Sequence, residues 1–374
     1  MPAQISSVGR VDALDGLRTV AVAAVVVSHA AGPLMPGGHV GVDVFFTLSG
    51  FVITLLLLRE FNATGRVSLR AFYLHRLARL WPAMLAVCAI VVVLALVAPN
   101  EWGEQGWNAV LSASHTMNLW RGGWFGSSVD GGALGHTWSL AVEEQFYLVW
   151  PLILVVLLRK LTLRAVSAVT AVLVVLALVE RAALAFSGVS PWRLANGPDT
   201  RADQLLIGCL LAMLLTLAPG SRIHEWSIRL AWPAGLVLVT AAFLLVPHDG
   251  PGPLDVAMRA FSPILIAATS AVLISGLVCA SGQGLSLLLA HKALAWTGRN
   301  LSYGIYLWHY PILFGVREVI EFPGAEILRA ALSVALTIAV AYLSARYIEA
   351  PIRSAAKRAT VAPAKRPRHR AAHS

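Results

Sequence analysis

Long apolar segments dominate this sequence and restrict it to one kind of fold. A helix needs about 20 mainly apolar residues to cross the hydrocarbon core of a bilayer. Such windows occur at residues 16–34, 41–58, 82–99, 139–158, 163–186, 203–218, 230–247, 261–281, 301–317 and 327–348. Hydrophobic side chains make up 57% of the 374 residues and charged ones only 13%, which excludes an ordinary soluble domain. We therefore predict an all-α fold, a polytopic membrane protein with a bundle of about ten transmembrane helices.

The positions of lysine and arginine predict the orientation, because positively charged loops remain on the cytoplasmic side of a membrane. With the N-terminus inside, most of the 29 basic residues fall in cytoplasmic segments. We expect a multi-pass protein of the bacterial cytoplasmic, or inner, membrane with both termini in the cytoplasm. The formal net charge of +10 is then mainly a property of the inner face, and we do not expect nucleic acid as a partner.

Two domains are predicted, a membrane domain at residues 1–350 and a basic tail at residues 351–374. The tail is rich in Ala, Pro and Arg, a composition typical of disordered segments that are attracted to anionic lipid. A topology determinant with no further function is the alternative. The three cysteines, Cys88, Cys209 and Cys279, all lie in apolar windows and are predicted to be small buried residues that form neither a disulfide nor a metal site.

The long connection from Asn100 to Thr137 is expected to be an external loop with a function, because loops of this length are otherwise uncommon. It contains four tryptophans, which either form an aromatic belt at the outer interface or stack on a sugar or polyketide acceptor: Trp102, Trp107, Trp120 and Trp124.

Two ionisable residues in the first predicted helix are the main functional candidates, because such groups are costly inside a membrane. Arg18 and His29 are eleven positions apart, about 20° more than three helical turns, so they share one face. Along the axis they are separated by about 16 Å, which places Arg18 near the cytoplasmic surface and His29 past mid-membrane. A buried neutral histidine is a candidate general base. The alternative is a structural histidine that bonds to a neighbouring helix.

Asp43 opens the second predicted helix at a depth from which it could orient the imidazole of His29. Capping its own helix is an equally good interpretation. Arg76 and Arg79 are three positions apart and share a helical face, which suits recognition of phosphate; anchoring at the cytoplasmic surface is the alternative.

Adjacent carboxylates, Glu143 and Glu144, enter the fourth predicted helix. Glu143 shares a stripe with Ser139 and Tyr147, whereas Glu144 points about 100° away, so at most one of them is expected to line a shared cavity.

A further polar stripe is formed by Ser302, Tyr306 and His309, for which interhelical hydrogen bonding is the alternative to a role in a site. We take His29, Asp43 and Glu143 as catalytic candidates. The candidate substrate-binding residues are Ser139, Glu144, Tyr147, Tyr306 and His309.

Together these residues resemble the membrane acyltransferase-3 family of O-acyltransferases, which modify polysaccharides, lipids and secondary metabolites. The resemblance extends over nearly the whole chain. It rests on Leu14-Asp15-Gly16-Leu17-Arg18 with His29, Gly41-Val42-Asp43-Val44-Phe45-Phe46 through Ser49-Gly50-Phe51, Arg76-x-x-Arg79, Trp138-Ser139-Leu140 with Glu143-Glu144-Gln145-Phe146-Tyr147 and Trp150-Pro151, and Ser302-Tyr303 through His309-Tyr310-Pro311.

The resemblance implies a ten-helix bundle that moves an acyl group, usually acetyl, from cytoplasmic acyl-coenzyme A to a hydroxyl. It implies a catalytic role for His29 and donor-binding or otherwise essential roles for Arg18, Arg76 and Arg79. Acyl-coenzyme A is then a co-substrate, and neither a permanently bound cofactor nor a metal is expected. Many relatives carry a further extracytoplasmic esterase-like domain; this chain ends after the tenth predicted helix, which favours direct transfer.

Several alternatives remain open at the level of sequence. The acceptor is a hydroxyl of a cell-surface or exported glycan, or instead a macrolide-like metabolite or a glycolipid. His29 acts either as a base or as an acylated carrier. A secondary transporter is the alternative from another class, because intramembrane charges also build proton relays. An inert scaffold or polymer-export partner is a third.

Overall fold

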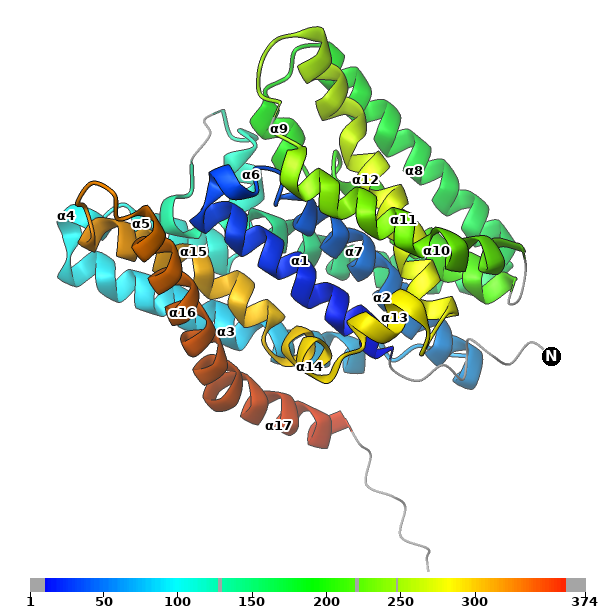
Figure 1. The fold of residues 1–374 in the computed structure, drawn as a ribbon. Helices are drawn as coiled ribbons and strands as arrows, with labels where there is room; N and C mark the ends of the chain where they lie inside the picture. The colour runs from blue at the N-terminus through cyan, green and yellow to red at the C-terminus, as the bar shows by residue number, and fades with distance from the viewer. Residues whose placement is uncertain (1–10, 127–129, 219–221, 247, 361–374) are drawn as a thin grey trace, which may run out of the picture.

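The computed structural model describes residues 11–126, 130–218, 222–246 and 248–360, and within these ranges the chain forms helices and no strand (Figure 1). The longer helices are α1 (Asp12–Ala30), α2 (Val40–Thr64), α3 (Leu69–Val97), α7 (Trp138–Lys160), α8 (Leu163–Phe186), α10 (Ala202–Leu217), α11 (Arg222–Leu244), α12 (Pro253–Cys279), α15 (Ser302–Val319) and α16 (Glu326–Ser344). The shorter ones are η1 (Gly32–Leu34), α4 (Pro99–Trp102), α5 (Gln105–Ala113), α6 (Met117–Arg121), η2 (Gly132–Thr137), α9 (Pro191–Asn196), α13 (Gly284–Leu289), α14 (Lys292–Asn300), η3 (Ala345–Glu349) and α17 (Ala350–Thr360).

Eight helical segments of the described chain are long and apolar enough to cross a membrane, as judged by length and composition. Six of them are the single helices α1, α2, α3, α8, α11 and α12. The other two are the segment formed by η2 and α7 and the continuous run from α16 to α17. The two other predicted windows fall on α10, which has 16 residues, and on α15, whose apolar character is reduced by Tyr, Trp and His side chains. The all-α membrane class is confirmed, whereas the count of about ten spans is not.

Glycines bring the central helices into backbone contact. A Cβ atom at Gly50 of α2 would lie 1.9 Å from the backbone oxygen of Leu205 in α10, and one at Gly208 would lie 2.0 Å from that of Thr47. Only glycine permits this approach, so α2 and α10 pack with their backbones touching. Cys209 is buried in the same interface, with its Sγ 3.5 Å from the Gly50 carbonyl, and is a packing residue.

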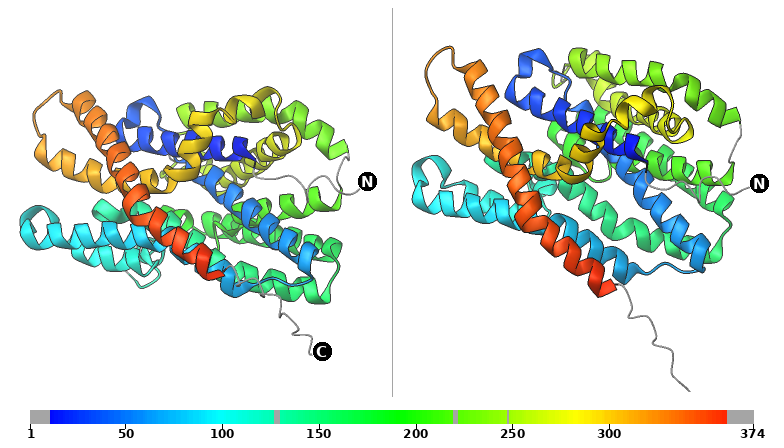
Figure 2. Two further views of the ribbon diagram at one scale, coloured as in Figure 1. Left: turned by 90° about the horizontal axis from the view of Figure 1, so that it is seen from below. Right: turned by 60° about the horizontal axis from the view of Figure 1, so that its bottom comes forward.

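The connection between α3 and α7 does not run free of the bundle, because its short helices pack on other elements. Helix α5 folds back beside α3 (Figure 2), and the following turn places the His115 ring on Trp81 with the ring centroids 5.7 Å apart. Trp81 precedes the end of α3 by 16 residues, which is about 24 Å along the helix. The connection therefore runs back along the bundle and reaches the middle of α3.

Polar side chains stabilise this re-entrant segment. The Gln145 amide nitrogen of α7 donates to the His115 carbonyl and to the Asn118 side-chain oxygen, both at 2.9 Å. Asn118 donates back to the Gln145 oxygen at 3.2 Å. In this way side chains of the bundle provide partners for polar backbone groups of the segment.

The tryptophans of the connection have different environments. Trp102 is buried against Phe314, with the ring centroids 5.0 Å apart, and so belongs to the core and not to an interfacial belt or a sugar platform. Trp107 and Trp124 are about half exposed, at 53% and 47%, and remain candidates for either role.

The expected disorder of the tail is wrong for residues 351–360. These residues form most of α17, which packs on α3. At the last residue of α17, the Thr360 Oγ1 atom lies 2.8 Å from Nε2 of His75 in α3. The rest of the predicted tail, residues 361–374, lies outside the described residues.

Candidate functional site

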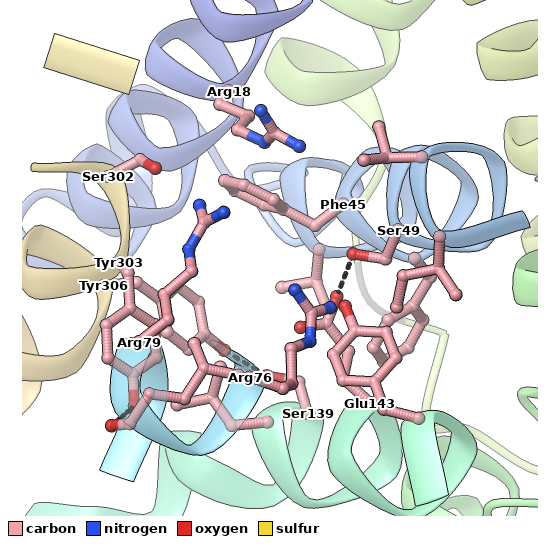
Figure 3. Close-up of a pocket in the computed structure, with 17 residues that line it drawn as sticks. Arg18, Phe45, Ser49, Arg76, Arg79, Ser139, Glu143, Ser302, Tyr303 and Tyr306 are labelled. Carbon is pink, nitrogen blue, oxygen red and sulfur yellow. Dashed lines mark hydrogen bonds between the residues drawn. The ribbon is translucent and has the colours of Figure 1, made fainter. Parts of the chain in front are cut away.

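A pocket between α1, α2, α3, α7 and α15 collects most of the predicted site residues (Figure 3). Its volume is about 750 Å³, including the space at its open mouth. We call it the arginine pocket. Among the predicted residues that line it are Arg18, Arg76, Arg79, Ser139, Glu143, Tyr147 and Tyr306.

The arginines of this pocket are only partly neutralised. Arg18 donates to the Asp15 carboxylate at 2.7 Å, and Asp15 is shared with Arg299 of α14 at 3.3 Å. Within the described chain, the guanidinium groups of Arg76 and Arg79 form no hydrogen bond or ion pair, and the Arg76 Nε atom is buried without a partner. Figure 3 shows Arg18, Arg76 and Arg79 around the same pocket, with the guanidinium group of Arg79 directed towards the side on which Arg18 lies. The arrangement is suited to an anion with several oxygen atoms.

The two adjacent carboxylates of α7 face different spaces. Glu143 lines the arginine pocket and accepts a hydrogen bond from the Ser49 hydroxyl at 2.7 Å. Glu144 lines a second cavity with Trp81 and His115. Arg76 and Tyr147 line both spaces, with the guanidinium 3.6 Å above the ring centroid, so this stacked pair separates the two cavities.

His29 lies outside the arginine pocket, in a cluster of four rings that we call the histidine cluster: His29, His136, His309 and Tyr310. The Nδ1 atom of His29 is 3.0 Å from the Nε2 atom of His309. His136 meets His309 edge to face, with the ring centroids 5.0 Å apart, and stacks on Tyr310 at 5.3 Å. The structure thus brings together His29 and His309, which the sequence suggested separately as a catalytic and a substrate-binding residue.

Asp43 does not take the orienting position that the sequence suggested for it. Its Oδ1 atom accepts hydrogen bonds from Arg201 at 3.0 Å and from the Gln204 side chain at 2.9 Å. The carboxylate is 3% exposed and is therefore committed to α10, because a buried carboxylate needs such partners. The partner of the His29 imidazole is His309 instead.

Tyr306 connects the two parts of the site. Its hydroxyl lies at the wall of the arginine pocket, 2.5 Å from the Ser139 hydroxyl. Its backbone oxygen accepts a hydrogen bond from Nδ1 of His309 at 2.5 Å. One residue therefore separates the arginine pocket from the histidine cluster.

Sequence reasoning assigned no role to His136, which belongs to the cluster, or to Arg121 and Arg317, which lie beside it. Arg317 donates to the backbone oxygen of His29 at 3.0 Å. Burial lowers the pKa of Arg121, and Asp130 opposes that shift. One signal in the sequence was Pro311, which has no N–H group and so leaves the Leu307 carbonyl without its helical donor. In the structure, Nε2 of His136 lies 3.1 Å from that carbonyl oxygen and takes the place of the donor. In the ranges that the structure describes, no group of three or more His, Cys, Asp or Glu side chains is arranged to hold a metal ion.

A family model described as "Acyltransferase domain" matches residues 11–346. The chain is similar to the peptidoglycan O-acetyltransferase OatA of Listeria monocytogenes, with 34% identity over 92% of this chain and 56% of the relative. It is also similar to the O-acetyltransferase OatA of Staphylococcus aureus, with 30% identity over 91% of this chain and 57% of the relative. The chain thus spans little more than half the length of these relatives. No solved structure gives a significant match.

We expect the substitution Asp43→Asn to lower the thermal stability of the protein, because Arg201 would keep a buried charge without its counterion, a loss of roughly 3–5 kcal/mol. The midpoint of thermal unfolding in detergent measures the effect. The double variant Asp43→Asn with Arg201→Gln should recover part of the loss, since both charges are then absent. An unchanged midpoint in Asp43→Asn would contradict a structural role for this carboxylate.

Proposed function

The chain belongs to the acyltransferase-3 family, and from that premise we propose that it transfers an acetyl group from acetyl-coenzyme A to a hydroxyl of a cell-wall glycan. The names of the two relatives, both O-acetyltransferases and one a peptidoglycan O-acetyltransferase, support the acyl group and the class of acceptor. The multi-pass architecture supports a membrane location.

The observation that carries the proposal is the excess of positive charge in the arginine pocket. Arg18, Arg76 and Arg79 line it together with one carboxylate, Glu143, while Asp15 is shared with Arg299. Buried like charges repel one another and are costly to desolvate, so they persist where a ligand neutralises them. Coenzyme A carries its phosphates at the nucleotide end, and guanidinium groups bind phosphate with paired hydrogen bonds.

The shape of the site fits a donor that is anionic at one end and reactive at the other. The pocket extends from Arg18 to the hydroxyl groups of Ser139 and Tyr306, and the histidine cluster lies directly beyond Tyr306. In this arrangement the nucleotide lies at the arginines and the pantetheine arm points along the pocket towards His29. The concentration of basic residues beside the N-terminal end of α1 supports a cytoplasmic location for the donor.

The chemistry then takes place at His29. The Nε2 atom removes the proton of the acceptor hydroxyl while its oxygen attacks the thioester carbonyl carbon. The carbon–sulfur bond breaks, an ester forms, and the coenzyme A sulfur leaves with the proton returned by His29. General base catalysis of this kind contributes about 10²- to 10⁴-fold in rate.

We expect Arg79→Ala to weaken the binding of coenzyme A by about 10- to 100-fold, because a hydrogen bond to a charged group contributes roughly 1.5–3 kcal/mol. Isothermal titration calorimetry of the protein in detergent measures the Kd. Arg70→Ala is the matched control, since Arg70 is an exposed arginine at the start of the same helix and does not line the pocket. Equal Kd values for the two variants would count against the arginine pocket as the donor site.

We expect His29→Gln to lower the rate of acetyl transfer by about 10²-fold or more while the Kd of coenzyme A stays within about twofold, because the base is lost and the arginines are intact. The release of coenzyme A and the acetylation of glycan fragments, followed by mass spectrometry, measure the two sides of the reaction. His248→Gln, a histidine bonded to Asp255 away from the pocket, is the control. Full activity in His29→Gln would exclude His29 as the base.

A further inference from the structure

We propose that His309 is a positioning residue that fixes the tautomer of His29 and thereby makes Nε2 of His29 the basic atom. The proposal deepens the proposed function and rests on it. It also reassigns His309, which the sequence suggested as a substrate-binding residue.

The positions of the protons follow from a chain of two hydrogen bonds. The Nδ1 atom of His309 is 2.5 Å from the backbone oxygen of Tyr306. A carbonyl oxygen only accepts, so Nδ1 of His309 carries the hydrogen, and its Nε2 in the neutral ring carries a lone pair. That lone pair is 3.0 Å from Nδ1 of His29, which must therefore be the donor. The remaining nitrogen of neutral His29, Nε2, is left with a free lone pair.

Helix α15 holds His309 in place through its own backbone. Tyr306 and His309 are three positions apart, so the ring of His309 reaches the carbonyl one turn back. His309 is 2% exposed, and the Tyr306 hydroxyl is tied to Ser139 of α7. The ring of His309 is thus fixed from both sides, and rotation would break one of its two hydrogen bonds.

Pro311 fixes the third ring of the cluster. A proline has no N–H group, so the Leu307 carbonyl four residues earlier has no helical donor. His136 of η2 supplies one, with its Nε2 atom 3.1 Å from that oxygen. The sequence from Tyr306 to Pro311 therefore provides two backbone oxygens that orient two imidazole rings.

The groups around His29 make this arrangement necessary. Among the described residues, no carboxylate forms an ion pair or a hydrogen bond with His29 or His309, and Asp43 is committed to Arg201. The charged groups that face the cluster are Arg317, at the His29 carbonyl, and Arg121. In hydrolases with a Ser-His-Asp triad a carboxylate holds the histidine tautomer. Here a neutral imidazole nitrogen accepts the Nδ1 hydrogen of His29 and adds no charge.

Three substitutions at one position test the proposal. In His309→Gln the side-chain oxygen can reach the place of Nε2 and accept from His29, whereas the shorter side chain in His309→Asn reaches only the place of Nδ1. We expect His309→Gln to keep kcat for coenzyme A release within about tenfold of the unsubstituted protein. His309→Asn and His309→Ala should lose about 10²-fold or more in kcat, with KM for acetyl-coenzyme A within about twofold.

The outcomes separate this proposal from the proposed function. An unsubstituted protein that releases no coenzyme A from acetyl-coenzyme A with glycan fragments would overturn the proposed function and this proposal with it. An active protein with equal losses, or no losses, in the Gln, Asn and Ala variants would overturn only the positioning role.

A second measurement reads the tautomer in the unsubstituted protein, and a variant serves only to assign the signals. Nitrogen-15 NMR of histidine-labelled protein reports the tautomer of each imidazole, and His29→Gln identifies the His29 signals. A hydrogen on Nδ1 of His29 is the expected result, and a hydrogen on Nε2 would overturn the proposal.

Discussion

The continuity of α1 is the constraint on which the rest of the structure depends. Arg18 and His29 belong to one unbroken helix and share one face, so their separation of about 16 Å along the axis is fixed by helix geometry and not by loops. The other parts of the site lie beside the two ends of this stretch of α1. Helices α3 and α7 place their polar side chains at the Arg18 end, and α15 places His309 beside His29. Because α2 and α10 touch through Gly50 and Gly208, the site is held by backbone contacts on the far side of α2.

Charge is distributed unequally along this axis. The arginine pocket holds more positive than negative groups, whereas the histidine cluster consists of rings whose hydrogen bonds are made among themselves and to backbone oxygens. The first arrangement costs free energy because like charges are buried together, and the second contains no ion pair between its rings. The Tyr306 and Ser139 hydroxyl pair lies between them. A molecule that binds by its phosphates and reacts at its far end fits such a gradient.

The sequence predicted those features that depend on one helix at a time. Helical spacing placed Arg18 with His29 and separated Glu143 from Glu144, and the structure puts these two carboxylates in different cavities. Features that depend on contacts between distant segments were missed. For Asp43 the sequence left two roles open, orienting His29 or capping its own helix, and the partner that the structure gives it, Arg201, follows only from the packing of α10 against α2. The re-entrant path of residues 105–121 could not be read from its Gly- and Trp-rich composition, because its depth is set by the contact of His115 with Trp81.

A donor that binds at the arginine end and reacts at the histidine end must enter the protein from one particular face of the membrane. Proteoliposomes in which the protein has one orientation, established by the accessibility of a tag at the C-terminus, test it directly. Acetyl-coenzyme A cannot cross the bilayer and is supplied to one face at a time, with glycan fragments present on both. We expect release of coenzyme A when the donor is supplied at the face next to Arg18 and the N-terminal end of α1. Release that occurs only with the donor at the opposite face would contradict it.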